Sequence, residues 1–253
     1  MGILLDIITI TKDDLKGVAS TIESTRPLRN SSVARQIIID GGSTQVRYQV
    51  EELIKHEKNV TYNWQASSGI SAAFNQGLLL SESQWVWFLN GGDTFHPSVD
   101  CRTLLNILQA STADAILFQI EANISHTVSK HAPLWKTWPP IGGYTNWIPH
   151  PSAIIKRQLF DTHGHFNTEY KIAMDYELWL RLFSKNTIVD TISIPLTMFD
   201  ETGISSNQAR NAAQEAVKII WSNMPMLFKK WLYNGIMICK SLRYYYKQSR
   251  NSR

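Results

Sequence analysis

Short apolar runs alternate along this chain with longer stretches in which apolar and polar residues are mixed. The runs have the length and the β-branched or aromatic content of buried strands at residues 4–10, 35–39, 85–89 and 115–120. Residues 61–65 and 188–198 are also strand-like. The mixed stretches predict helices at residues 13–25, 45–56, 71–81 and 99–109. This alternation predicts an α/β fold with a mostly parallel central sheet flanked by helices.

After residue 120 the alternation becomes less regular. Residues 133–149 are rich in proline, glycine and tryptophan and predict an ordered loop. Helices are predicted at residues 175–183, 208–221 and about 226–247, and a polar loop at residues 201–207. We therefore expect one domain over residues 1–207, followed by a basic, helical C-terminal extension over residues 208–253.

The 253 residues are 43% hydrophobic, which suits one domain with a substantial core. Two distant cysteines, Cys101 and Cys239, predict reduced thiols and indicate neither a disulfide framework nor a zinc site. The apolar start lacks a basic leader and is interrupted by Asp6, so it predicts a first strand and no signal peptide. No apolar run is long enough to predict a membrane span.

The net charge of +4 is unevenly distributed. Residues 1–215 hold 17 basic and all 21 acidic residues, and the eight remaining basic residues come after Glu215. A weakly acidic body argues against nucleic acid as its partner. The tail mixes these basic residues with aromatic and apolar ones, so we expect residues 226–250 to meet an anionic membrane surface. Because its apolar positions form no single stripe, packing on the body or on a partner stays equally open.

The first candidate for chemistry is Asp93, which ends the segment FLNGGD at residues 88–93. A buried strand followed by two glycines delivers one acid to the edge of a sheet, where ligands of open α/β sheets bind. Such an acid can hold a divalent metal ion, and through it a diphosphate. A loop aspartate that caps a turn is the other interpretation.

A second acid, Asp40, ends the apolar run at residues 37–39 and is followed by Gly-Gly-Ser-Thr. Its carboxylate could accept hydrogen bonds from a nucleobase or a ribose, or it could serve only as a turn or helix cap. The turn has neither the G-x-G-x-x-G spacing of dinucleotide folds nor a P-loop, which argues against a P-loop ATPase.

A third acid, Asp175, opens a predicted helix and is a candidate general base, although acids also favour the first turn of helices. His150 comes after a loop rich in tryptophan and could contact phosphate or a hydroxyl, or be structural. Aromatic residues of that loop could stack on sugars or simply fix the loop, and they are Trp135, Trp138, Tyr144 and Trp147.

Taken in order, these segments resemble family 2 glycosyltransferases of the GT-A fold over about residues 3–205. The motifs that carry the resemblance are IIIDGGST at residues 37–44, SGISAAFNQG at 68–77, FLNGGD at 88–93, HPS at 150–152 and MDYELWLRL at 174–182. The chain looks most like the colanic acid, capsule and O-antigen biosynthesis branch of that family.

This resemblance implies roles for particular residues. Asp175 would be the catalytic base, and Asp93 would bind Mg²⁺ or Mn²⁺. Contacts to the nucleotide would come from Thr9, Asp40, Gly41, Ser68, Asn75, Asn90 and Gly91. Contacts to the acceptor or to phosphate would come from His150, Trp147 and Glu177. Where the family commonly has further acids, this chain has Ser68 and the segment Asn90-Gly91-Gly92, so we expect weaker metal binding.

The resemblance also implies an activity. A base that removes a proton from a hydroxyl opposite the leaving group inverts the anomeric centre, so we expect an inverting transferase. The donor would be a nucleotide-diphosphate sugar, and the acceptor a glycan or lipid-linked hydroxyl in bacterial surface polysaccharide biosynthesis. We expect a cytoplasmic protein, peripheral on the inner membrane.

Two alternatives stay open. A non-catalytic sugar-nucleotide or glycan-binding protein would not need the further acids that the segment at residues 90–93 lacks. A nucleotidyltransferase would need a basic, glycine-rich loop near the first strand, and the chain has Lys12 and Lys16 there but not the loop.

Overall fold

The computed structural model describes residues 2–128, 148–183, 186–202 and 208–223. Within them an eight-stranded sheet runs in the order β3-β2-β1-β4-β7-β6-β8-β5. The strands are β1 (Leu5–Thr11), β2 (Ala34–Asp40), β3 (Val60–Trp64), β4 (Trp85–Asn90), β5 (Thr94–Phe95), β6 (Ala115–Ala122), β7 (Ala153–Lys156) and β8 (Val189–Phe199).

The first half of the sheet confirms the predicted parallel arrangement. Strand β1 pairs in parallel with β2 on one side and with β4 on the other, and β2 pairs in parallel with β3. In the second half, β6 and β8 are also parallel, but β7 is antiparallel to β4 and β6, and β5 is antiparallel to β8. The strand order therefore diverges at β1, and in open α/β sheets ligands bind near such a point.

Seven helices accompany the sheet in the described residues. They are α1 (Leu15–Asn30), α2 (Thr44–Ile54), α3 (Ile70–Leu80), α4 (Cys101–Ala110), α5 (Gln158–His163), α6 (Met174–Leu182) and α8 (Ala209–Asn223). A short 3-10 turn, η2 (His150–Ser152), precedes β7. Six of these helices confirm predicted ones, and α5 was not predicted. The predicted helix at residues 226–247 and most of the predicted loop at residues 133–149 lie outside the described residues.

Helix α1 continues past the predicted end near Thr25, through Pro27. The tertiary structure explains the extra turn. Leu28 is fully buried, and the buried guanidinium of Arg29 donates to the Ile22 carbonyl and pairs with Glu57, each at 2.8 Å. The stabilisation from these contacts exceeds the cost of the backbone hydrogen bond that Pro27 cannot donate.

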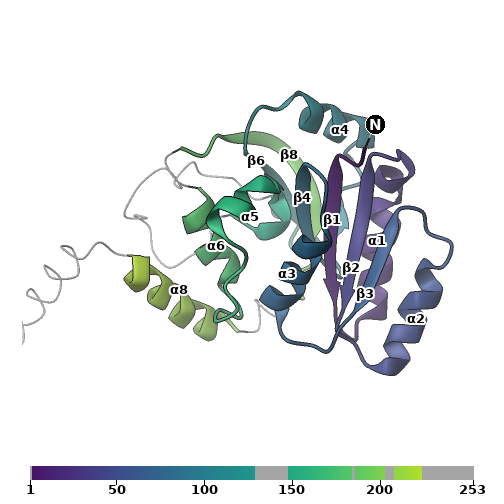
Figure 1. Ribbon diagram of the computed structural model, residues 1–253, viewed down its shortest axis with the longest axis horizontal. Coiled ribbons are helices and arrows are strands. Elements are labelled where there is room, and N and C mark those ends of the chain that lie inside the picture. Colours follow the sequence, from purple (N-terminus) through teal and green to yellow (C-terminus); the bar gives the residue numbers. More distant parts are fainter. Residues whose placement is uncertain (1, 129–147, 184–185, 203–207, 224–253) are drawn as a thin grey trace, which may run out of the picture.

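Helices cover both faces of the sheet, as Figure 1 shows. Because side chains alternate along a strand, consecutive residues of a strand pack on opposite faces of the sheet. Ile8 and Phe88 pack in one core with residues of α3, α5, α6 and α8, whereas Ile7 and Trp87 pack in a second core with α4 and the end of α1. A third, smaller cluster joins α1 and α2 to β2.

Helix α8 packs against this same body. Its Ala216 and Ile219 are buried in the core that also contains Leu178 of α6. Figure 1 shows α8 below α6, on the side where the sheet is covered by α3, α5 and α6. The predicted division into residues 1–207 and 208–253 stays a prediction, and the extension beyond Asn223 lies outside the described residues.

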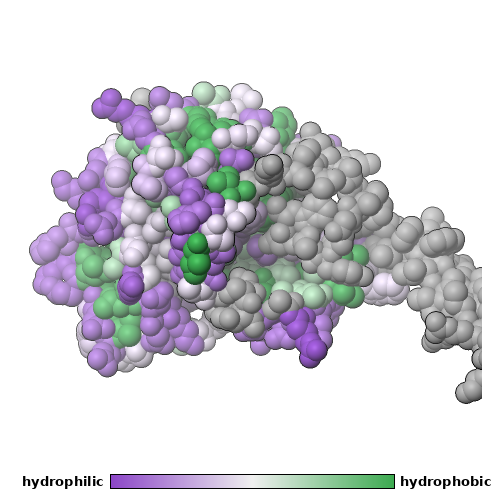
Figure 2. Space-filling model, turned by 180° about the vertical axis from the view of Figure 1, so that it is seen from behind, coloured by the Kyte–Doolittle hydropathy of each residue, from purple (hydrophilic) through white to green (hydrophobic). Residues whose placement is uncertain are grey.

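The surface carries both hydrophilic and hydrophobic residues. From behind, Figure 2 shows hydrophilic residues around several small hydrophobic patches. In the part of the chain that the structure describes, no helix combines the length and the apolar character needed to cross a bilayer.

Candidate active site

A cavity of about 790 Å³ opens where the carboxyl ends of the central strands meet α6 and α8. Loops after β1, β2, β3 and β4 contribute mainly polar residues, and the second half of the chain contributes acids and apolar residues. The lining includes Lys12, Gly41, Ser68, Asn90, Gly91, Asp93, His150, Lys171, Asp175, Tyr176, Asp200, Ala212 and Ala216.

Asp93 reaches this cavity because the chain turns sharply after β4. Gly92 has a φ of +105°, a conformation that residues other than glycine rarely adopt. The Asp93 carboxylate then accepts hydrogen bonds from the backbone N–H groups of Asn90 and Asp200, both at 3.1 Å. Its side chain is only 1% exposed. The turn therefore fixes one buried carboxylate at the cavity wall.

A second carboxylate, Asp200, faces the same place from the end of β8. Burial raises the pKa of Asp93 to about 7, and the negative charge of Asp200 acts in the same direction. The Asp200 carboxylate accepts hydrogen bonds from Thr202 and from the side-chain amide of Asn123. Two acids held together in a poorly solvated place are disfavoured without a cation, so these residues suit a divalent metal ion.

A purely protein-based metal site is not indicated. The described residues contain no group of three or more His, Cys, Asp or Glu side chains that could hold a metal ion. A cation bound by Asp93 and Asp200 would need further oxygen ligands from water or from a bound diphosphate. Asp200 was not predicted, although the signal was in the sequence, since it comes directly after an apolar strand.

Asp175 lies at the start of α6 and lines the cavity with an exposure of 7%. Its Oδ1 accepts a hydrogen bond from the Tyr176 backbone N–H at 2.8 Å. This bond and the positive end of the helix dipole keep an anion favourable at this position. The structure thus brings Asp93, Asp175 and Asp200 to one cavity from three distant segments of the chain.

Asp40 is placed differently from the other acids. It is fully buried and lies outside the cavity lining that the described residues form. Its carboxylate accepts hydrogen bonds from the Gly42 backbone at 2.7 Å and from the Tyr62 hydroxyl at 2.8 Å. Burial raises the pKa of Tyr62, and the bond to Asp40 raises it further. Asp40 thereby shapes the turn in which Gly41 does line the cavity.

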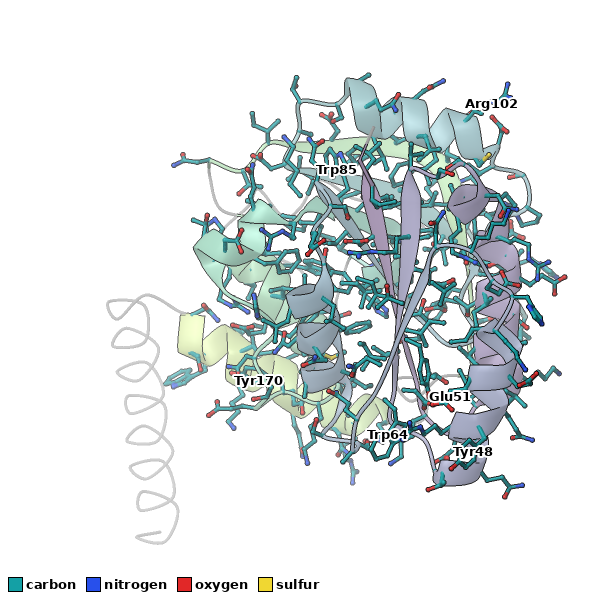
Figure 3. The ribbon with its side chains drawn as sticks, turned by 45° about the vertical axis from the view of Figure 1, so that its right-hand side comes forward. Tyr48, Glu51, Trp64, Trp85, Arg102 and Tyr170 are labelled. Carbon is teal, nitrogen blue, oxygen red and sulfur yellow. The ribbon has the colours of Figure 1, made fainter. Side chains whose placement is uncertain are left out.

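Trp64 supports the same turn from β3. Its indole N–H donates to the Gly42 carbonyl at 2.9 Å, and the guanidinium of Arg47 lies 5.2 Å from the centre of its ring. Figure 3 shows Trp64 near Tyr48 and Glu51 of α2. The end of β2 is therefore held in place from β3 and α2.

The remaining predicted nucleotide contacts divide into two groups. Ser68, Asn90 and Gly91 line the cavity with Gly41. Thr9 is fully buried in the sheet, where its hydroxyl accepts a hydrogen bond from Gln36 at 3.0 Å. The amide of Asn75 donates to and accepts from the backbone of Phe166, both at 2.9 Å. The geometry therefore gives Thr9 and Asn75 roles within the fold.

Of the predicted acceptor contacts, one lines the cavity and another is paired within the fold. His150 lines the cavity, and burial lowers its pKa to about 4, so its ring is neutral near pH 7. Glu177 instead pairs with Arg181 through both carboxylate oxygens, at 2.7 and 2.8 Å, and lies outside the lining of the cavity. Trp147 lies outside the described residues, as do Trp135, Trp138 and Tyr144.

Polar groups at the cavity include the predicted residue His150 and three groups that were not predicted as site residues, those of Tyr176, Lys12 and Lys171. The buried His150 Nε2 and the buried Tyr176 hydroxyl have no hydrogen-bond partner among the described residues. Lys12 and Lys171 are exposed and line the cavity from two sides. Buried polar atoms without partners are rare in folded proteins, and at a cavity they indicate that a polar ligand completes them.

The mixed α/β sheet, with its acid-lined cavity at the carboxyl ends of the strands, is the arrangement of GT-A glycosyltransferases, and comparison with known proteins identifies this protein as a glycosyltransferase with that fold. More particularly, the chain belongs to glycosyl transferase family 2, whose family model matches residues 6–179. The resemblance inferred from the motifs is thereby confirmed.

Relatives and solved structures agree with this assignment. An "uncharacterized glycosyltransferase" of Mycobacterium tuberculosis (strain CDC 1551 / Oshkosh) is 28% identical over 221 residues, which cover 82% of this chain and 79% of that protein. A "PGL/p-HBAD biosynthesis glycosyltransferase" of Mycobacterium bovis (strain BCG / Pasteur 1173P2) is 21% identical over 213 residues, covering 74% of this chain and 75% of that protein.

Two similar structures extend the comparison of folds. TarS 1-349 from S. aureus in complex with UDP has a TM-score of 0.66 at 16% identity, over 86% of this chain and 64% of that chain. This chain therefore spans less than two thirds of that TarS structure. The mannosyltransferase PcManGT from Pyrobaculum calidifontis, in complex with GDP-Man and Mn2+, has a TM-score of 0.62 at 13% identity, over 94% and 81% of the two chains.

Proposed function

We propose that this glycosyltransferase moves a sugar, with inversion, from a nucleotide-diphosphate donor to a hydroxyl of a glycan or lipid-linked acceptor in bacterial surface polysaccharide assembly. The observation that carries the proposal is the convergence of Asp93, Asp175 and Asp200 on one cavity. The structures that resemble this chain support the donor class, because TarS was solved with UDP and PcManGT with GDP-Man.

In this proposal the donor lies along the carboxyl ends of β1, β2 and β4. Gly41, Ser68, Asn90 and Gly91 line that part of the cavity, where glycines allow close approach of a ligand to the backbone. Lys12 and Lys171 provide positive charge for the diphosphate from two sides.

The residues that would hold Mg²⁺ or Mn²⁺ are Asp93 and Asp200, together with diphosphate oxygens. The ion would supply positive charge that stabilises the departing nucleoside diphosphate. Both ions prefer oxygen ligands, so the site suits Mg²⁺ and Mn²⁺ alike.

Asp175 is the proposed general base. As the acceptor oxygen forms its bond to the anomeric carbon, the bond from that carbon to the diphosphate breaks, and the hydroxyl proton passes to the Asp175 carboxylate. Attack from the face opposite the leaving group inverts the anomeric centre. The neutral ring of His150 and the Tyr176 hydroxyl would orient the hydroxyls of the two sugars by hydrogen bonds.

The test is a sugar-transfer assay with a panel of nucleotide sugars and Mn²⁺, in which NMR of the product reports its anomeric configuration. We expect transfer with inversion for one donor. The variant Asp175→Asn should bind that nucleotide with unchanged affinity and lose at least about 100-fold in kcat, because a general base contributes about 10²–10⁴-fold. Retention of configuration, or full activity of Asp175→Asn, would refute the role of Asp175.

A further inference from the structure

The segment that leads into α6 is held by a carboxylate from another helix. Glu215 of α8 accepts hydrogen bonds from three successive backbone N–H groups, those of Lys171 at 3.0 and 3.2 Å, Ile172 at 2.9 Å and Ala173 at 2.8 Å. A run of adjacent N–H groups forms a concave site for an anion. Hydrogen bonds to an ionised acceptor are about twice as strong as neutral ones.

This contact acts immediately before Asp175. Ala173 is the N-cap of α6 and offers no side-chain cap to the helix, and Asp175 is the second helical residue. The backbone path over residues 171–173 therefore decides where the helix begins. A shift of that path would move the Asp175 carboxylate relative to the cavity.

Helix α3 holds the same loop further back. The Ser71 hydroxyl donates to the Tyr170 carbonyl at 2.9 Å, and the Asn75 amide bonds to the backbone of Phe166. Figure 3 shows Tyr170 beside α8, near α3. Of these contacts from α3 and α8, those of Glu215 lie closest to Asp175 along the chain, and they come from a helix whose Ala212 and Ala216 also line the cavity.

We propose that Glu215 is a positioning residue for the transfer reaction, which holds residues 171–173 so that Asp175 meets the acceptor hydroxyl. This inference rests on the proposed function of Asp175. The family match ends at residue 179, so α8 and Glu215 lie beyond the matched residues.

The test compares Glu215→Gln and Glu215→Ala with the full-length wild type. Glutamine keeps the shape of the side chain but replaces one accepting oxygen by an amide donor that faces backbone N–H groups. We expect kcat to fall about 10- to 100-fold for Glu215→Ala and less for Glu215→Gln, because a displacement of about 1 Å can cost about 10²-fold. The donor KM should change much less than kcat, because Glu215 contacts only the backbone N–H of Lys171 and leaves its ammonium group available to the donor. Glu169→Gln, which removes an exposed carboxylate of the same loop, is the control and should leave kcat unchanged.

Two further measurements separate positioning from general loss of structure. Amide hydrogen exchange should accelerate in a peptide spanning residues 170–178 for both Glu215 variants, and not in peptides from the central strands. In an Asp175→Asn background, Glu215→Ala should cost little further activity, because both changes remove the same function.

The outcomes are distinguishable. Unchanged exchange over residues 170–178, or a fall in kcat that is equally large in the Asp175→Asn background, would overturn the role of Glu215. If the wild type transfers no sugar with any donor, the proposed function fails. The exchange comparison then still decides whether Glu215 holds the loop.

Discussion

At the scale of single residues, an acid at the end of a strand can be used in two ways, and this chain shows both. Asp40 has both carboxylate oxygens engaged by Gly42 and Tyr62 within the fold. Asp93 and Asp200 line the cavity, and the raised pKa of Asp93 records how poorly the site tolerates negative charge without a cation. The difference depends on whether the fold itself supplies partners for the carboxylate.

The first prediction concerns Asp200. In the variant Asp200→Asn the side chain keeps its size but loses the charge that would help to hold a divalent ion. We expect the gain in nucleotide affinity on adding Mn²⁺ to fall about tenfold or more, which corresponds to about 1.4 kcal/mol. Isothermal titration calorimetry with UDP, with and without Mn²⁺, measures this gain.

The control for Asp200 is Asp190→Asn, which removes an exposed acid from β8, the strand that ends just before Asp200. In this variant the gain in nucleotide affinity on adding Mn²⁺ should equal that of the wild type. If Asp200→Asn also keeps the full gain, Asp200 is not a metal ligand.

The second prediction concerns the pH dependence of stability. Burial lowers the pKa of His150 to about 4, from 6.5 in the unfolded chain. Between these values the unfolded chain binds a proton here that the folded protein does not, so the free energy of unfolding falls as the pH falls. The contribution is complete above pH 6.5, and about 3 kcal/mol of it is lost by pH 4. We expect His150→Gln to lack this loss.

Urea unfolding at pH 7.5 and pH 5 measures the effect as a difference between wild type and variant. The comparison of wild type with variant is needed because Asp93 changes the free energy of unfolding with pH in the opposite direction. Its pKa is raised to about 7, so its contribution is complete below pH 3.8 and is lost as the pH rises through 7. His56→Gln, at an exposed histidine, is the control and should behave like the wild type. The prediction would be contradicted if the free energies of unfolding of the wild type and His150→Gln changed equally between pH 7.5 and pH 5.

At the scale of elements, the loop over residues 164–173 shows how two helices fix the path of the chain that leads to Asp175, the proposed general base. Helix α3 holds its early part through Ser71 and Asn75, and α8 holds its end through Glu215. The loop has its own turns, but the contacts that fix its path come from residues far away in the sequence. Asn75 therefore contacts the loop that leads to Asp175 through the backbone of Phe166.

The third prediction tests this role of Asn75 against the nucleotide contact implied by the family resemblance. Asn75→Ala leaves the Phe166 N–H and carbonyl without their partner, which we expect to lower the free energy of unfolding by about 1–3 kcal/mol. Donor affinity should stay within about twofold of the wild type, while kcat falls. Calorimetry with UDP, urea unfolding and a transfer assay measure these three quantities. Gln76→Ala on the same helix is the control, and a selective loss of nucleotide affinity in Asn75→Ala would restore the predicted contact.

The elements also show how far local patterns in a sequence can predict a fold. Long apolar runs and mixed stretches located β1, β2, β4, β6 and the helices around them, because local periodicity is a property of neighbouring residues. Strands β5 and β7 have only two and four residues, too few for a periodic pattern, and they form because antiparallel partners are present. The role of Asp40 depended on Tyr62, and that of the 171–173 segment on Glu215, and no local pattern reveals such pairings.

At the scale of the whole molecule, α8 joins the C-terminal part of the chain to the site. Its buried face belongs to the core under α6, its small residues line the cavity and its Glu215 holds the loop before Asp175. We therefore expect a chain that ends at Asn223 to keep the fold and transfer to a soluble acceptor. A chain that ends at residue 207 should lose both stability and activity.

The last prediction concerns the basic segment after α8. Residues 224–253 carry seven basic residues and no acidic one, interspersed with aromatic and apolar residues, and the body up to Glu215 is weakly acidic. Each lysine or arginine near an anionic leaflet contributes about 1 kcal/mol to binding. We expect the full chain to sediment with vesicles that contain anionic lipid, less with zwitterionic vesicles, and less as salt is raised. The chain ending at Asn223 should not sediment with either, although it should still transfer sugar to a soluble acceptor. Equal sedimentation of the two chains would place any membrane contact on the body, and equal binding to both kinds of vesicle would exclude the electrostatic basis of the prediction.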